Sequence, residues 1–159
     1  MGTQEDYHSS GPSGGIGGFP FYLTWPSGAF KIVAVWGRSG SRIDQIGLDW
    51  STKNGIVSSP PCGGGGGSPF KFDIPADDYL TDIFGTVDNY NGSIRVFSLK
   101  LVTKGKVVGT YGTQEEYQFS YTSPPGYQVI SIFGRAGNQP GSPPAGALDA
   151  LGVTIEPIV

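Results

Sequence analysis

The sequence predicts an all-β fold built from many short strands. Segments rich in β-branched and aromatic residues alternate with clusters of Gly, Pro, Asn and Asp, and helical periodicity is almost absent. The 159 residues include 27 Gly and 13 Pro, but 13% are aromatic, which favours a loop-rich folded domain over a disordered chain. Many short strands with short connections are typical of a sandwich, a barrel or a prism.

Ten segments fit the strand pattern, and turn-forming residues separate them. In chain order they are Phe19–Thr24, Ala29–Gly37, Ile43–Ser51, Phe70–Ile74, Leu80–Val87, Ile94–Thr103, Val107–Gly109, Tyr117–Tyr121, Gln128–Gly134 and Ala147–Glu156. The polar start of the chain precedes them. We therefore expect a flexible N-terminal segment over residues 1–12 and a single domain over residues 13–159.

Three sections of the chain repeat one pattern, in which a glycine-containing loop and an aromatic strand precede a turn between two longer strands. The loops read SGGIGGFPF, CGGGGGSPFKF and YGTQEEYQFSY. Three similar four-stranded sheets around an axis bury their inward faces together, because one such unit is too small to form a core alone. The apolar residues expected to line that core are Ile32, Val35, Ile43, Ile46, Leu48, Ile130, Ile132, Leu148, Leu151 and Val153.

Composition and charge argue against several classes of function. A net charge of −3 without a basic run disfavours nucleic acid and anionic membranes, and no apolar run is long enough for membrane insertion. Cys62 is the only cysteine and His8 the only histidine, so we expect no disulfide, metal or cofactor. The aspartates form no evident catalytic pair, which argues against an enzyme. The first residues lack a signal-peptide pattern, which predicts a soluble protein, cytoplasmic or released without classical export.

The repeated segments together resemble the jacalin-related lectins. The resemblance rests on GGIGGFPF, GRSGSRIDQIG, GGGGGSPFKF and GRAG…ALDALGV in this order, and it spans about residues 14–157. It implies a β-prism of three Greek-key sheets that binds carbohydrate without catalysis. The start of the chain is more similar to the mannose-binding branch of the family than to the galactose-binding branch.

The turn at residues 40–44 is the first candidate carbohydrate site. A sugar offers adjacent hydroxyls, so a shallow site needs a carboxylate that accepts their hydrogens and backbone amides that donate. Asp44 supplies the carboxylate, and Arg42 is expected to reach over the rim to a second sugar. The alternative is a hairpin turn in which Asp44 only caps backbone donors. By the family resemblance the turn pairs with the next glycine loop, so the site comprises Gly40, Ser41, Arg42, Ile43, Asp44, Gly63 and Gly64.

A stretched copy of this turn lies near the C-terminus, with eight additional residues in its middle. The insertion, residues 138–145, either widens the site for a different or longer glycan or blocks a site that has been lost; its prolines favour a semi-rigid segment. The second candidate site comprises Gly14, Gly15, Gly146, Ala147, Leu148 and Asp149.

The middle section has no carboxylate in the corresponding turn. We expect Val96 at the position of Asp44, so this section binds no sugar or binds it through Glu115 or Glu116. Two functions compete with mannose or glucose binding: a galactose-type lectin, and a β-prism scaffold for protein partners. Because a shallow monosaccharide site binds weakly, a glycan-binding protein of this type is expected to form a homodimer or a higher homo-oligomer.

Overall fold

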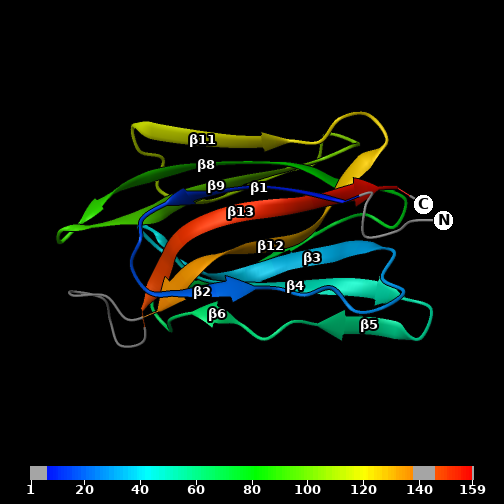
Figure 1. Ribbon diagram of the computed structural model, residues 1–159, viewed down its shortest axis with the longest axis horizontal. Helices are drawn as coiled ribbons and strands as arrows, with labels where there is room; N and C mark the ends of the chain where they lie inside the picture. The colour runs from blue at the N-terminus through cyan, green and yellow to red at the C-terminus, as the bar shows by residue number, and fades with distance from the viewer. Residues whose placement is uncertain (1–6, 138–145, 159) are drawn as a thin grey trace.

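The computed structural model describes residues 7–137 and 146–158, which form three antiparallel sheets around one core (Figure 1). This arrangement confirms the predicted all-β class. The described chain starts and ends in the same sheet, because its first two strands pair with its last two.

The first sheet has the order β1-β13-β12-β2. Its strands are β1 (His8–Gly14), β2 (Phe19–Tyr22), β12 (Tyr127–Gly137) and β13 (Ala147–Pro157). The second sheet contains β3 (Lys31–Ser39), β4 (Ile43–Thr52), β5 (Gly55–Ser58), β6 (Cys62–Gly63) and β7 (Ser68–Asp73). The third sheet, with the order β10-β9-β8-β11, contains β8 (Leu80–Tyr90), β9 (Ser93–Thr103), β10 (Val108–Gly112) and β11 (Tyr117–Thr122).

The second sheet has a fifth strand because its outer strand is interrupted. Both β5 and β6 pair with β4, and Pro60 and Pro61 lie between them. Proline has no backbone N–H to donate to a neighbouring strand, so pairing stops and restarts around this dipeptide. The other two sheets have four strands, as expected.

The core lies where the inward faces of the three sheets meet. All ten apolar residues predicted to line it are buried, none of them more than 2% exposed. The indole Nε1 of Trp50 donates to the carbonyl oxygen of Ile130 at 2.7 Å. This bond joins the second sheet to the first and satisfies the one polar atom of the largest fully buried side chain.

Strands β1, β5 and β6 were not predicted from the sequence. Residues 8–12 were expected to be flexible, but they belong to β1, which pairs with β13 from His8 opposite Ile155 to Gly14 opposite Ala150. That expectation is wrong for these residues, whereas residues 1–6 lie outside the described part of the chain. β1 reads HSSGPSG, and a polar edge strand of this kind carries no apolar alternation to reveal it.

The connections that carry the candidate sites lie together at one end of the molecule. The β1–β2 connection and the β8–β9 turn are at the left in Figure 1, whereas β1 begins and β13 ends at the right. Gly15 in the first of these segments packs so closely on the carbonyl oxygen of Ile94 that a Cβ atom would clash there. Within the described residues, no helix is long and apolar enough to cross a membrane.

Candidate functional site

Asp44 occupies a β-bulge between β3 and β4. Arg38 lies opposite Gln45 and Ser39 lies opposite Ile43, so Asp44 is the extra residue of the bulge. A bulge re-aims the side chain that it carries, and bulges are frequent beside functional sites. The side chain of Asp44 is only 5% exposed, so just an edge of the carboxylate meets solvent.

A glycine loop, residues 63–67, wraps this carboxylate. The amide of Gly64 donates to the backbone carbonyl of Asp44 at 2.7 Å. A Cβ atom built at Gly66 would lie 3.0 Å from Oδ1 of Asp44, and one at Gly67 would lie 2.8 Å from Oδ2. Gly67 also has a φ of +68°, which other residues rarely adopt. Glycine at these positions therefore lets the loop backbone approach both oxygens of the carboxylate with no loop side chain between them.

Arg38 fixes the position of this loop. Its Nε donates to the carbonyl oxygen of Gly66 at 3.0 Å, and its Nη2 donates to that of Gly67 at 2.8 Å. Two parallel bonds from one planar guanidinium define both the distance and the orientation of the loop. We call Arg38, Asp44 and residues 63–67 the Asp44 site.

Arg42 does not reach over the rim as the sequence suggested. Its side chain is 7% exposed, with Nε 3.6 Å from Oδ1 of Asp44, and its guanidinium carbon lies 4.3 Å from the ring centre of Tyr90. The expectation of contact with a second sugar is wrong for this structure. Gly40 and Ser41 are exposed in the turn, whereas the side chain of Ile43 belongs to the core.

The same arrangement recurs at Asp149. This residue is the extra residue of a bulge between β12 and β13, because Arg135 lies opposite Ala150 and Ala136 lies opposite Leu148. The amide of Gly15 donates to the carbonyl oxygen of Asp149 at 2.8 Å. We call Arg135, Asp149 and the glycine loop at residues 14–18 the Asp149 site.

Arg135 holds the loop of this second site as Arg38 holds the first. Its Nε and Nη2 donate to the carbonyl oxygens of Gly17 and Gly18, both at 2.9 Å. A Cβ atom at Gly18 would lie 2.6 Å from Oδ2 of Asp149. The two sites thus share the bulge, the glycine loop and the arginine that bonds two successive loop carbonyls.

The two sites differ in access. The side chain of Asp149 is 0% exposed, and neither of its carboxylate oxygens has a hydrogen-bond partner among the described residues. Of its predicted neighbours, Ala147 and Leu148 are fully buried, and Gly146 has a φ of +95°. The insertion at residues 138–145 lies outside the described part of the chain. The Asp149 site therefore contains two unused acceptors in an enclosed place.

Burial shapes the acidity of both carboxyl groups. Burial raises the pKa of Asp149 to about 6, against the opposing charges of Arg95 and Arg135. Burial also raises the pKa of Asp44, which Arg42, Arg38 and Arg95 counteract. The arginines thus favour the ionised, hydrogen-accepting form of each group.

The raised pKa of Asp149 predicts a component of stability that falls as pH rises. Its pKa is about 6 in the folded state and near 3.8 in the unfolded state, so the folded state binds more protons between these values. The stabilisation is complete below pH 3.8 and is lost as pH rises through 6. Denaturant titrations of wild type and Asp149→Asn from pH 4 to pH 7 measure it. We expect the wild-type free energy of unfolding to fall relative to that of the variant; parallel profiles would contradict the assignment.

In the third sheet, Phe97 occupies the position of the two aspartates. Thr86 lies opposite Ser98 and Val87 lies opposite Val96, so the extra residue of that bulge is Phe97 and not Val96, the residue that we expected from the sequence. The amide of Thr113 donates to the carbonyl oxygen of Phe97 at 2.9 Å, as Gly64 does to Asp44. The third sheet therefore keeps the backbone pattern without the carboxylate.

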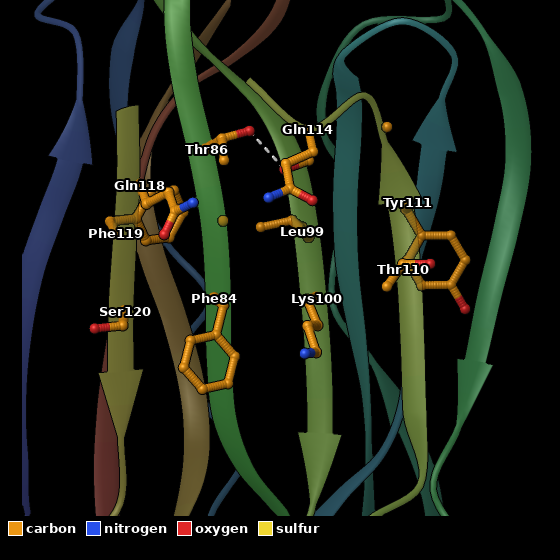
Figure 2. A pocket seen from close by; sticks show the side chains of 13 residues that line it. Phe84, Thr86, Leu99, Lys100, Thr110, Tyr111, Gln114, Gln118, Phe119 and Ser120 are labelled. Atoms are coloured by element: carbon orange, nitrogen blue, oxygen red, sulfur yellow. Dashed lines mark hydrogen bonds between the residues drawn. The ribbon is translucent and has the colours of Figure 1, made fainter. Parts of the chain in front are cut away.

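An open groove of about 700 Å³ runs over the third sheet. Figure 2 shows Gln114 and Gln118 on either side of Thr86, and Phe84 beside Lys100. The hydroxyl of Thr86 accepts a bond from the amide of Glu115 at 3.0 Å, so a threonine tethers this loop where arginine tethers the other two. Neither Glu115 nor Glu116 lines the groove.

Sequence reasoning missed the residues that hold the sites together. Arg38 and Arg135 belong to the repeated GR dipeptides of GRSG and GRAG, so the sequence contained a signal. The glycines that they bond, Gly66 and Gly17, lie 28 and 118 residues away in the chain. Tyr90 and Arg95 gave no signal at all. Within residues 7–137 and 146–158, no group of three or more His, Cys, Asp or Glu side chains is arranged to hold a metal ion.

Comparison with known proteins gives matches over nearly the whole chain. The family model described as Jacalin-like lectin domain matches residues 10–154. Horcolin from Hordeum vulgare subsp. vulgare is 31% identical over 149 residues, which cover 92% of this chain and 95% of horcolin. The Mannose/glucose-specific lectin of Parkia platycephala is 29% identical over 155 residues, which cover 94% of this chain and 32% of that protein.

The three-sheet arrangement also matches solved structures. The wild-type Malaysian banana lectin superposes with a TM-score of 0.79 at 27% identity, over 94% of this chain and 98% of that one. The fold is thus the β-prism of the jacalin-related lectins, which are carbohydrate-binding proteins without catalytic activity. From its sequence, its fold and these matches, the chain belongs to the jacalin-like lectin family.

Proposed function

We propose that the protein binds glycans that present mannose or glucose, with the Asp44 site as its main binding site. The observation that carries this proposal is the Asp44 carboxylate, held in a bulge beside an all-glycine loop that brings no side chain against either oxygen. A carboxylate in such a place accepts hydrogens from two adjacent hydroxyls of one sugar ring. The mannose/glucose class is supported by the name of the relative from Parkia platycephala.

The Asp149 site is proposed as a second, weaker site. Its two carboxylate oxygens have no hydrogen-bond partner among the described residues, and sugar hydroxyls would satisfy them. Because the side chain is 0% exposed, binding there requires neighbouring residues to move, and that movement lowers the affinity. The order of affinities is therefore expected to be Asp44 site first and Asp149 site second.

Multivalency is the expected route to useful affinity. A monosaccharide that contacts a few polar groups in a shallow site binds with a Kd on the order of millimolar. Two sites per chain, multiplied by assembly into a homodimer or a larger homo-oligomer, raise the avidity for a glycan-coated surface by about 10²–10⁴. Light scattering coupled to size exclusion tests the assembly; a monomer at all concentrations would contradict it.

The wild-type protein and a set of epimeric sugars test the proposed function. Methyl α-mannoside and methyl α-glucoside are expected to bind measurably in calorimetric titrations, and methyl α-galactoside at least about tenfold more weakly, the size of one lost polar contact. A reversed preference would favour the galactose-type alternative. If the folded protein binds no glycan on a dense array, sugar binding is overturned. The remaining function is then that of a β-prism scaffold for protein partners.

Gly66 and Gly65 provide a matched pair of variants within one loop. In Gly66→Ala the new methyl group lies 3.0 Å from Oδ1 of Asp44, close to the place of a bound hydroxyl. At Gly65 no described atom lies within 4 Å of a built Cβ. We expect Gly66→Ala to lower mannoside affinity about tenfold or more, as one blocked charge-assisted bond predicts, and Gly65→Ala to change it little. Equal effects of the two variants would contradict the placement of the ligand.

A further inference from the structure

The third sheet inserts its hairpin between the two candidate sites. Tyr90 ends β8, and Ser93, the first residue of β9, lies opposite it. Arg95 follows two residues later on β9, and the carbonyl oxygen of Ile94 touches Gly15 of the Asp149 site. The sheet without a candidate carboxylate is therefore in contact with the sites of the other two sheets.

Tyr90 contacts the Asp44 site through Arg42. The guanidinium carbon of Arg42 lies 4.3 Å from the ring centre of Tyr90, and Nε of Arg42 lies 3.6 Å from Oδ1 of Asp44. Both charged side chains are at most 7% exposed. The ring attracts the cation through its electron-rich face, so it fixes the position from which Arg42 acts on Asp44.

Tyr90 contacts the Asp149 site through Arg95, with a similar set of distances. The guanidinium carbon of Arg95 lies 4.9 Å from the centre of the same ring, and Nε of Arg95 lies 3.9 Å from Oδ1 of Asp149. The side chains of Arg95 and Asp149 are both 0% exposed. One aromatic ring therefore serves two buried arginine–aspartate pairs that belong to different sites.

The geometry of the pairs leaves the carboxylate oxygens without a hydrogen bond from Nε of either arginine. At 3.6 and 3.9 Å the arginine nitrogens are too far for hydrogen bonds, yet close enough to stabilise the negative charge. The two cations repel each other, and each is attracted by the carboxylate beside it. The ring of Tyr90 contacts both guanidinium groups, so it attracts each of them in addition to the carboxylate beside it.

We propose that Tyr90 is a positioning residue shared by both sites: it holds Arg42 against Asp44 and Arg95 against Asp149. Its role in sugar affinity rests on the function proposed above, whereas its action on the carboxyl groups does not. The middle section of the repeat, which forms the third sheet and has no carboxylate in its own turn, then supports the sites of the other two sections.

Two measurements on Tyr90→Leu test this proposal, one at each site. The first follows the Gly64 amide by NMR during a titration with methyl α-mannoside. We expect the affinity at the Asp44 site to fall about threefold to tenfold, the range for loss of one partly buried cation–π contact. The second follows the carboxyl carbon of Asp149 against pH without sugar. Its midpoint is expected to rise above that of the wild type, because Arg95 is held less firmly.

Three further variants make the result specific. Tyr90→Phe keeps the ring and is expected to show the wild-type mannoside affinity and the wild-type Asp149 midpoint. A role of the hydroxyl group would instead change these values. Tyr79→Leu is the matched control, since Lys31 Nζ lies 5.3 Å from the Tyr79 ring centre just before the opposite end of β8. It is expected to change neither value. Tyr90→Gln replaces Tyr90→Leu if the latter does not fold.

The outcomes separate this proposal from the proposed function. A change at only one site, no change at either, or a Tyr90→Phe variant as impaired as Tyr90→Leu would overturn the shared role. If the wild-type protein gives no response to any sugar, the proposed function fails. In that case, pH titrations of the Asp149 and Asp44 carboxyl carbons without sugar still decide whether Tyr90 acts on both pairs.

Discussion

Asp44→Asn is expected to lower the affinity of the Asp44 site for methyl α-mannoside at least about a hundredfold. The substitution keeps the shape of the side chain but removes its charge and exchanges one acceptor oxygen for an NH₂ donor. Two charge-assisted hydrogen bonds are lost, each worth about 1.5–3 kcal/mol. Calorimetry and agglutination measure the effect. Asp149→Asn is expected to have a smaller effect on the total signal, because the enclosed site contributes less.

A second aspartate of the same strand provides the control for this experiment. Asp49 on β4 accepts a hydrogen bond from the indole of Trp36 at 2.8 Å and has no part in either site. Asp49→Asn is expected to bind sugar like the wild type. Thermal unfolding of each variant shows whether the fold is retained. If folded Asp44→Asn binds mannoside as well as Asp49→Asn does, the carboxylate is not the acceptor.

Arg38→Lys is expected to weaken the Asp44 site about tenfold and leave the Asp149 site unchanged. Arg38 bonds two successive carbonyls, those of Gly66 and Gly67, with the two arms of one planar group. A lysine ammonium keeps the charge but does not reproduce this fork, so the loop loses its fixed position beside Asp44. The tenfold figure corresponds to about 1.4 kcal/mol, the size of one hydrogen bond to a charged group.

Arg135→Lys is the reciprocal experiment, because the two arginines have equivalent partners. It is expected to weaken the Asp149 site and spare the Asp44 site. Amide resonances of Gly64 and Gly15 report the two sites separately in one NMR titration. An equal loss at both sites from either variant would show a general effect on folding and would contradict a local role for the arginines.

Much of the fold followed from the sequence. The ten predicted strands are all present, because apolar alternation and glycine- or proline-rich turns mark strands that have one buried face. Strands β1, β5 and β6 were not predicted, because they are short or polar edge strands. Pairing with β13 or β4, and not a pattern in their own residues, keeps them extended. The interrupted edge of the second sheet follows from Pro60 and Pro61, which the repeat pattern did not take into account.

The candidate sites were predictable only in part. The family resemblance paired Gly64 with Asp44 and Gly15 with Asp149, and the structure has a backbone hydrogen bond between the members of each pair. The resemblance did not show that both carboxylates are buried or that Arg42 turns inward. Arg42 packs on the ring of Tyr90, which belongs to another sheet and carries no local pattern. The shift from Val96 to Phe97 has a similar cause, since a bulge is set by strand register.

The most direct test of the account is an NMR titration of the wild-type protein, labelled with ¹⁵N, with methyl α-mannoside. We expect saturable chemical-shift changes of the Gly64 and Gly66 amides with a Kd on the order of millimolar. In Asp44→Asn these changes are expected to disappear. Saturable shifts confined to the groove of the third sheet, at residues such as Thr110 and Gln118, would contradict the account. So would the absence of any shift up to about 100 mM sugar.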